Sequence, residues 1–436
     1  MRRRGLFFRC LSFAAAMAAL STTAHASSFA LQEYSVRDLG QANAGFAALG
    51  EDASTVFSNP AGLARLKKPE ITIGTIGLLA HSKFEDRGST LVNTLPQTGV
   101  ADRGFVGTAA IPDFFAALPI HDRITLGLGV TAPYGMLVDY DPHWIGRYEA
   151  TNSTMQAIDI NPSIGIEVMK GVRIGLGFSA QYFKGRISNA IDGGLLIGGP
   201  GASGAADGSV DVQASDWGVG VNAGLMVDVT PKTRFGFAYR SRIDHELHGY
   251  ADFTINPLIP LGTGGAFTDT PVQIGFELPA SYAFSVHHDA TDKLALMASL
   301  LYTRWSVFQQ LNVIYANPAQ NALSTPELYN SRNTLRGAIG ARYQLCPSLS
   351  INAGIAYDQT PTASGFESAR LPDASRFIGA TGFSWTPKPG VAVDFAYQHI
   401  ALRSLQIDRT GVLGDQLKGQ YQAAAELFGL GVRAQF

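Results

Sequence analysis

The sequence is poor in charge, in cysteine and in long apolar runs. Asp, Glu, Lys and Arg make up 16% of its 436 residues, whereas an ordinary soluble domain carries about 25%. The net charge of −2 provides no basic field of the kind that binds nucleic acid, so no nucleic-acid partner is predicted. After the N-terminal leader, no stretch is long and apolar enough to be a transmembrane helix.

The cysteines and histidines give no sign of a disulfide framework, a metal site or an active site. Cys10 lies in the apolar leader, so Cys346 would be alone in the mature chain and could form no intramolecular disulfide. His245 and His248 are one residue short of the zinc-protease spacing, and in a strand they would point to opposite faces. No Gly-x-Ser-x-Gly nucleophile motif occurs. The sequence therefore predicts neither an enzyme nor a cofactor.

The N-terminus has the three parts of a secretory signal peptide. Residues 1–4 are cationic, residues 6–20 are mostly apolar, and Ala24-His25-Ala26 offers the small residues that a signal peptidase recognises. A transmembrane anchor is the alternative, but the apolar part is too short to span a bilayer comfortably. We therefore predict export, with a signal peptide over residues 1–26 that is cleaved near Ala26.

Apolar residues alternate with small or polar ones along much of the remaining chain. Successive side chains of a strand point to opposite faces, so each such run predicts a strand with one apolar face. That face would meet lipid in an outer-membrane barrel but would point inward in a soluble β-sandwich, so alternation alone leaves both folds open. Tyr182, Tyr239, Tyr302 and Tyr397 end apolar runs, as in the aromatic girdle of a barrel. The clearest runs are 172–182, 219–229, 235–239, 294–302 and 391–397.

Short turns alternate with long polar or glycine-rich segments. This asymmetry is typical of outer-membrane barrels, which have short periplasmic turns and longer extracellular loops. Six turns and seven loops predict an all-β, antiparallel transmembrane β-barrel of about fourteen strands over residues 70–436. The turns lie at 119–122, 169–171, 230–233, 289–292, 346–348 and 385–390. The loops are expected near 85–102, 141–152, 188–212, 249–272, 309–331, 361–373 and 405–422.

The C-terminal residues have the pattern of a closing barrel strand. Phe428, Leu430, Val432 and Phe436 share one face, while glycines and polar residues occupy the other. A terminal aromatic residue on such a strand is commonly recognised by the bacterial barrel-assembly machinery, so Phe436 is its predicted contact. The expected location is the bacterial outer membrane.

Residues 27–69 precede the first predicted strand and show no sustained alternation. A barrel of fourteen strands is too wide for its own inward side chains to fill, so this segment is predicted to be a plug of short helices inside the lumen. Asn59 and Pro60 suit a helix start, because Asn is a favoured N-cap and Pro is preorganised for the first helical position. An unstructured periplasmic tail is the alternative, which the apolar content of the segment disfavours.

These residues resemble the FadL-type family of outer-membrane transporters. The similarity is carried by Ser28-Phe29-Ala30-Leu31 and Asn59-Pro60-Ala61 in the plug and continues through residues 130–135 and 144–148. Elsewhere it is a similarity of pattern. The resemblance implies an N-terminal plug, called the hatch, and uptake of long-chain fatty acids or, in some relatives, of aromatic hydrocarbons.

The resemblance also implies a route. In this family an apolar substrate is caught among the extracellular loops, passes to a tighter pocket beside the hatch N-terminus, and leaves sideways through a kink in the third strand. Here Pro133, Tyr134 and Gly135 would form this lateral gate, since Pro cannot donate a ladder hydrogen bond and Gly tolerates unusual backbone shapes. A third strand that ends before Pro133 is the alternative.

By the same resemblance, Phe29 is the hatch residue expected beside the tight pocket. Asn59, Pro60 and Ala61 are expected to be substrate-binding determinants of the hatch, although a helix cap is an equally good role for Asn59. Residues 144–148 carry a tryptophan and a tyrosine that are expected in the aromatic girdle rather than at the substrate.

Two basic residues are candidates for binding a fatty-acid carboxylate. Lys184 and Arg186 follow an apolar strand at a place where the family has basic residues. Both residues are an even number of positions from Tyr182 and so share its face of the strand. The alternative therefore places them on the outer surface, where they would snorkel or pair with lipopolysaccharide phosphates.

Three functions remain open at this point. Passive, ligand-gated uptake of long-chain fatty acids is the leading hypothesis, and uptake of aromatic hydrocarbons such as toluene is the second. An adhesin or structural surface barrel is the third, but a plugged lumen argues against it. The expected partners are hydrophobic small molecules, lipopolysaccharide and outer-membrane lipid, and the barrel is expected to be a monomer.

Overall fold

The structure is a computed structural model that describes residues 29–92, 94–101, 104 and 106–436. The predicted signal peptide lies outside the described residues. No helix of the described chain is long and apolar enough to cross a membrane.

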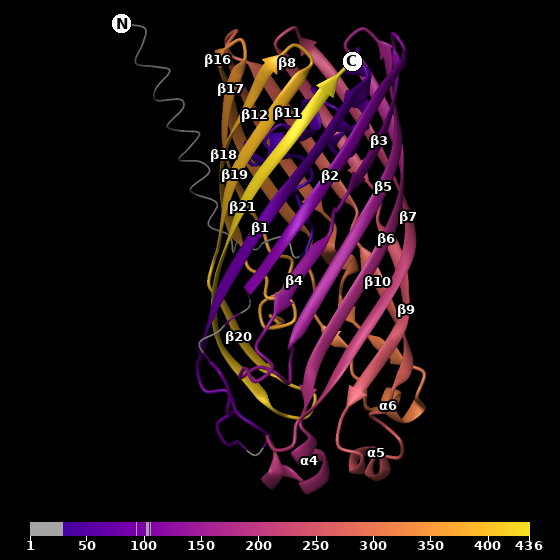
Figure 1. Ribbon diagram of the computed structural model, residues 1–436, viewed down its shortest axis with the longest axis vertical. Coiled ribbons are helices and arrows are strands. Elements are labelled where there is room, and N and C mark those ends of the chain that lie inside the picture. The colour runs from indigo at the N-terminus through magenta and orange to yellow at the C-terminus, as the bar shows by residue number, and fades with distance from the viewer. Residues whose placement is uncertain (1–28, 93, 102–103, 105) are drawn as a thin grey trace, which may run out of the picture.

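Within the described residues, nineteen strand segments form one antiparallel sheet, which closes where β1 pairs with β21 from Glu70↔Gln435 to Asp86↔Gly419. Five strands are each interrupted once, so the nineteen segments make fourteen barrel strands, and the predicted fold is confirmed (Figure 1). The uninterrupted strands are β1 (Glu70–Asp86), β2 (Val106–His121), β5 (Asn152–Met169), β6 (Val172–Ile191), β7 (Gly208–Thr230), β16 (Thr334–Cys346), β17 (Leu349–Asp358), β18 (Arg376–Lys388) and β21 (Gln416–Gln435). The interrupted strands are β3 with β4 (Ile124–Thr131, Gly135–Asp139), β8 with β9 (Thr233–Arg240, Ile243–Thr254), β10 with β11 (Thr270–Leu278, Ser281–Asp289), β12 with β14 (Leu294–Thr303, Val313–Tyr315) and β19 with β20 (Val391–Leu402, Leu405–Thr410).

The apolar face of the strands points outward. Val219 and Val221 on β7 are 64% and 54% exposed, whereas the inward polar side chains of Gln181 and Asn222 are buried. A soluble sandwich would show the opposite arrangement, because exposed apolar side chains on every strand are stable only against lipid. Tyr239, Tyr282 and Tyr302 form an outward row of ring contacts on three neighbouring strands.

The two ends of the barrel differ as the turn spacing predicted. Two-residue connections such as that between β5 and β6 lie at one end, while α4, α5 and α6 lie in the loops at the other end (Figure 1). The loop elements are α4 (Gly193–Gly198), η3 (Pro200–Ala202), α5 (Leu258–Gly262), η4 (Trp305–Val307), α6 (Pro318–Leu323) and a small two-stranded sheet of β13 (Gln310–Leu311) and β15 (Glu327–Leu328).

One predicted loop is wrong. Most of residues 405–422 belong to β20 and β21, which pair from Leu405↔Tyr421 to Thr410↔Gln416 and leave only 411–415 as a connection. Here the apolar side chains of Leu405 and Ile407 point inward and are buried, whereas Gln406 and Asp408 are exposed on the outer face. A polar outer face suits a strand that extends beyond the bilayer into water, and it therefore resembled a loop in the sequence.

The hatch lies in the lumen at the end with the short turns (Figure 1). Its elements are α2 (Val36–Leu39), η1 (Phe46–Ala48), α3 (Thr55–Ser58) and η2 (Pro60–Arg65). The predicted helix start at Asn59 is confirmed, because its Oδ1 accepts a hydrogen bond of 3.0 Å from the amide of Ala61 at the beginning of η2.

Glycines of the barrel wall make room for the hatch. A side chain at Gly175 of β6 would overlap the backbone of Pro60 and Ala61, and one at Gly224 of β7 would overlap the side chain of Asn59. The Nδ2 of Asn59 also donates to the carbonyl of Leu225 at 3.2 Å. The wall and the hatch therefore meet backbone to backbone at this point, which only glycine permits.

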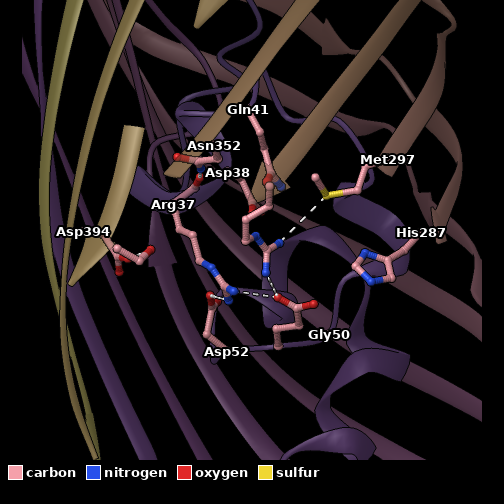
Figure 2. A network of polar contacts seen from close by, with 12 residues as sticks. Arg37, Asp38, Gln41, Gly50, Asp52, His287, Met297, Asn352 and Asp394 are labelled. Carbon is pink, nitrogen blue, oxygen red and sulfur yellow. Dashed lines mark hydrogen bonds and ion pairs between the residues drawn. The ribbon is translucent and has the colours of Figure 1, made fainter. Parts of the chain in front are cut away.

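A buried charge cluster ties the hatch to the barrel (Figure 2). Arg37 of α2 contacts Glu51 at 2.6 Å and Asp52 at 3.0 Å, and Arg342 of β16 reaches Glu51 from the wall. Burial acts to raise the pKa of Glu51, but Arg342 and Arg37 hold it well below its usual value. Removing one partner would leave a buried charge uncompensated, at a cost of roughly 3–5 kcal/mol. The body of the hatch is therefore firmly seated.

We predict that Gly175→Val unseats the hatch without preventing barrel closure. The valine must displace η2, whereas the outward Gly379, with no atom near its missing side chain, should accept valine as a matched control. Hydrogen exchange over residues 55–66 should rise by at least tenfold in Gly175→Val, while both variants stay heat-modifiable on gels. Equal protection in the two variants would contradict this account of the contact.

Candidate functional site

The N-terminal residues of the hatch pair with a break in the third barrel strand. β3 ends at Thr131 and β4 begins at Gly135. The amide of Leu31 donates to the carbonyl of Pro133 at 2.9 Å, and the amide of Gly135 donates to the carbonyl of Phe29 at 3.0 Å. Ala30 and Tyr134 thus form an isolated antiparallel bridge. The hatch supplies the peptide partners that the interrupted strand lacks.

The break leaves one edge of β4 without the hydrogen bonds of a neighbouring barrel strand. β3 pairs with β2 only from Phe114↔Val130 to His121↔Ile124, and the rest of β2 pairs with β1 alone. β4 pairs with β5 on its other side, and no strand pairing joins β4 to β2 among the described residues. Figure 1 shows β4 as a short separate arrow between β2 and β5. The backbone of the wall is therefore least continuous where the hatch N-terminus sits.

Phe29 fills an aromatic box beside the break. Its ring lies 4.8 Å from Trp305, 5.5 Å from Phe276, 5.5 Å from Phe308 and 6.0 Å from Tyr134, measured between ring centroids. Only 2% of Phe29 is exposed. The partners come from β10, from the η4 segment and from the break itself, so one hatch side chain links three parts of the barrel.

A small cavity of about 80 Å³ lies next to this box. Leu31, Tyr34 and Tyr134 contribute to its lining, together with Arg240 at the end of β8. The guanidinium of Arg240 lies 3.7 Å from the ring centroid of Phe57 and donates to the Phe57 carbonyl at 2.9 Å. This volume is well below the roughly 300 Å³ at which small-molecule sites begin, so the hatch leaves little free space here.

A larger pocket of about 780 Å³ opens among the long loops, at the end of the barrel away from the short turns. Ile191, Val210, Val212 and Leu311 line it, and the same four residues belong to the hydrophobic cluster that contains Phe29. One continuous cluster of packed apolar side chains therefore joins the pocket to the aromatic box, and we call this cluster the apolar path. Its volume falls in the range of small-molecule sites, about 300–1,000 Å³.

Four charged residues from separate segments meet at the wall of this outer pocket. The Nε of Arg370 donates to Glu327 at 2.9 Å, and its Nη2 donates to the carbonyl of Glu149 at 2.7 Å. Arg409 makes longer contacts, 3.5 Å to Glu149 and 3.6 Å to Glu327. Burial and the neighbouring Glu327 raise the pKa of Glu149 to about 7. The pocket thus combines aliphatic walls with a partly buried charge cluster.

The predicted hatch determinants other than Phe29 lie away from both cavities. Asn59, Pro60 and Ala61 are packed against the barrel wall and line neither the inner cavity nor the outer pocket. In this structure Asn59 caps η2 and bonds to the wall, as the helix-cap interpretation predicted. Direct contact of these three residues with a substrate is not supported by their position.

Lys184 and Arg186 also lie away from the path, on the outer face of β6. Both are exposed, and Arg186 pairs with Asp211 of the neighbouring β7 at 2.5 Å. They lie on the same outward face of the strand as Tyr182, because residues two apart on a strand share a face. The assignment of these two residues to a substrate carboxylate in the lumen is therefore corrected in favour of the outward alternative.

The girdle interpretation of residues 144–148 is wrong. Trp144 is fully buried and stacks on Tyr140 with ring centroids 4.0 Å apart. Arg147 pairs with Asp207 at 2.7 Å. These residues form the folded core of the loop between β4 and β5, whose compactness the sequence did not reveal.

A closed barrel with an apolar outer surface, a seated hatch and an apolar path to a break in the wall defines an outer-membrane transport barrel for hydrophobic molecules. A profile of the family described as "Outer membrane protein transport protein (OMPP1/FadL/TodX)" matches residues 17–436, and the chain belongs to this family. It is thus a transport protein of the bacterial outer membrane rather than an enzyme.

Relatives of known sequence match over nearly the whole chain. The 47 kDa outer membrane protein of Pasteurella multocida is 29% identical over 434 residues, covering 97% of both chains. The long-chain fatty acid transport protein of Escherichia coli K12 is 25% identical over 457 residues, covering 98% of this chain and 97% of that protein.

Solved structures show the same fold. A Pseudomonas aeruginosa FadL homologue superposes with a TM-score of 0.86 at 24% identity, covering 94% of this chain and 100% of the other. The Ralstonia pickettii toluene transporter TbuX superposes with a TM-score of 0.66 at 19% identity, covering 93% and 99%.

Sequence reasoning missed most of the residues that surround the path. Trp305 and Phe308 interrupt a barrel strand, and Arg370 and Arg409 are separated in sequence from their partners Glu149 and Glu327. The sequence held only a weak indication of these residues, namely that arginines occur in the predicted loops of a chain with few charges. Only the fold of the loops brings these side chains together.

We predict that the loop carrying Arg370, residues 359–375, loosens as pH rises. Burial raises the pKa of Asp373 in this loop to about 7, and Thr360 donates a hydrogen bond to its carboxyl group. A carboxyl group with a raised pKa in the folded state costs stability once it ionises, so order is lost as pH rises through about 7.

Between pH 6 and pH 8.5, the rate of hydrogen exchange in the loop should increase more than the intrinsic exchange rate of unprotected amides does. Asp373→Asn should remove this additional increase. The exposed Asp408→Asn is the control and should behave as wild type. An excess that persists in Asp373→Asn would rule out Asp373 as its cause.

Proposed function

We propose that this protein takes up long-chain fatty acids by passive, ligand-gated diffusion and releases them sideways into the bilayer. The observation that carries the proposal is the pairing of Phe29 and Leu31 with Pro133 and Gly135 at the break in the third strand. The same hatch residues close both the apolar path and the gap between β2 and β4, so their displacement would open both at once.

The proposed route has three steps. The alkyl chain enters the outer pocket, follows the aliphatic cluster to the aromatic box, and replaces the ring of Phe29 there. Displacing that ring and two backbone hydrogen bonds costs roughly 4 kcal/mol, from about 2 kcal/mol for a buried aromatic side chain and about 1 kcal/mol per bond. Burial of about five methylenes at about 0.8 kcal/mol each would offset this cost. A long-chain ligand is therefore able to drive the opening.

Exit through the wall follows from the same energetics. An alkyl chain that moved from the path into the aqueous periplasm would lose about 0.8 kcal/mol per methylene, whereas the bilayer beside β2 and β4 keeps it out of water. Pro133, Tyr134 and Gly135 are the proposed lateral gate, with Phe29 as the residue that blocks it.

Uptake of aromatic hydrocarbons is a second candidate function. The observation that favours it is the box of four rings around Phe29, in which a toluene-sized ring would replace the phenyl group with similar contacts. The charged residues at the outer pocket favour an amphiphile instead, because a hydrocarbon offers them no partner. The fatty acid is therefore the first proposal.

Three further assignments complete the proposal. Phe436, 72% exposed at the barrel edge, is the proposed contact for the assembly machinery. Lys184 and Arg186 are proposed to face lipopolysaccharide phosphates from the outer surface. The barrel is proposed to act as a monomer, since the path runs within one chain.

We predict that a disulfide between Ala30→Cys and Tyr134→Cys blocks uptake reversibly. The hydrogen bonds flank this pair, so it is a non-hydrogen-bonded antiparallel pair with Cα atoms about 4.5 Å apart, a separation that a disulfide can span. In a Cys346→Ser background, oxidised protein should take up labelled oleate at least tenfold more slowly than reduced protein, in cells that lack the native chain.

Each single cysteine variant is the control and should be insensitive to oxidant. Labelled toluene assayed in parallel separates the two candidate substrates. Full uptake of both labels by the crosslinked protein would rule out the hatch N-terminus as the gate. Equal uptake of both by cells with and without the protein would rule out transport.

A further inference from the structure

We propose that Arg409 is the head-group site of the outer pocket, where it binds the carboxylate of an amphiphile in exchange for its present counter-ion, Glu149. The inference rests on the proposed function and makes it more specific, because it names the chemical group that the outer pocket selects. Arg370 is a positioning residue in this scheme.

The two arginines differ in how completely they are partnered. Arg370 is buried, with hydrogen bonds to Glu327 and to the Glu149 carbonyl, and so it joins the loops that form the pocket. The guanidinium of Arg409 makes no hydrogen bond to another described residue, and its contacts with Glu149 and Glu327 are long, 3.5 and 3.6 Å. It lines the pocket with 20% of its side chain exposed. Arg370 keeps one unpartnered donor, its buried Nη1, whereas no donor of Arg409 is engaged in a hydrogen bond with a described residue, so Arg409 has the most donors to offer a ligand.

Of the two carboxylates that contact Arg409, Glu149 is held by fewer hydrogen bonds than Glu327. One of its oxygens makes the long contact with Arg409, and the other, Oε1, has no hydrogen-bond partner among the described residues. Glu327, in contrast, accepts hydrogen bonds from both Ser368 and Arg370. A ligand carboxylate that approaches Arg409 would therefore replace Glu149 rather than Glu327.

The surroundings of Glu149 decide how its charge responds to pH. Glu327 from β15 and Asp415 from the 411–415 connection raise its pKa, Arg409 from β20 and Arg370 from the 359–375 loop lower it, and burial is the largest influence. The phenol of Tyr421 on β21 also faces it. With a pKa of about 7, Glu149 becomes neutral as pH falls through 7, and Arg409 then keeps only one of its two negatively charged neighbours, Glu327.

The ligand class follows from these contacts. A carboxylate matches the fork of a guanidinium and forms charge-assisted hydrogen bonds with it. The aliphatic wall of Ile191, Val210 and Val212 can hold an alkyl tail at the same time. A hydrocarbon or a fatty alcohol would contact the aliphatic wall but would form no charge-assisted hydrogen bond with the arginine. The pocket should therefore prefer an anionic amphiphile, and more strongly below pH 7 than above it.

The first test compares oleate with oleyl alcohol, using the full protein in lipid nanodiscs. Arg409→Gln should weaken oleate binding about tenfold, as loss of a charged hydrogen bond predicts, and leave oleyl alcohol binding unchanged. Arg409→Lys should restore part of the preference. Arg403→Gln, which removes an exposed arginine just beyond β19, is the matched control and should bind both as wild type does.

The second test uses dodecanesulfonate, whose charge does not change with pH. Wild-type affinity should rise several-fold from pH 8 to pH 6, whereas Glu149→Gln should bind tightly at both values. An equal loss of both ligands in Arg409→Gln, no loss of either, or an unchanged pH dependence in Glu149→Gln would each overturn the proposal. These are binding measurements, so they are independent of uptake: transport without head-group selection would refute Arg409 alone, and head-group selection without transport would refute the proposed function alone.

Discussion

The fold depends on the requirement that every peptide group inside a bilayer has a hydrogen-bond partner, since lipid offers none. Fourteen paired strands and the seam between β1 and β21 meet this requirement over nearly the whole wall. The third strand fails to meet it between Thr131 and Gly135, and the hatch N-terminus provides the missing partners there. The weakest point of the wall and the N-terminal end of the hatch are thus held by the same two hydrogen bonds.

The hatch is fixed unequally along its length. Its body is held by glycine-lined contacts with β6 and β7 and by the buried cluster of Arg37, Glu51 and Asp52. Its first described residues are held by two backbone bonds and the ring of Phe29. Interactions of a few kcal/mol lie within reach of a ligand's own burial energy, whereas several buried ion pairs do not. Local movement of the N-terminal residues is therefore physically separable from loss of the plug.

The two pockets differ in chemistry. The outer pocket joins aliphatic side chains to a charge cluster assembled from four loops and strands, whereas the inner box around Phe29 is aromatic. An amphiphile can satisfy both parts of the outer pocket, and only its apolar part suits the box. On the proposed route, selection on the head group in the outer pocket would therefore come before displacement of Phe29.

The barrel, its strand number, the gathering of the short turns at one end and the break at Pro133 could all be predicted from the sequence, because period-two alternation, turn residues and proline act locally. The sequence also placed Phe29 and the Asn59 cap, through a family motif and a local capping rule. The folded chain was needed to show that Lys184 and Arg186 face outward, that Trp144 lies in a loop core and that Arg409 contacts Glu149. Loop contacts join residues far apart in sequence and follow no periodic pattern, whereas the residues of a strand alternate between lipid-facing and lumen-facing positions.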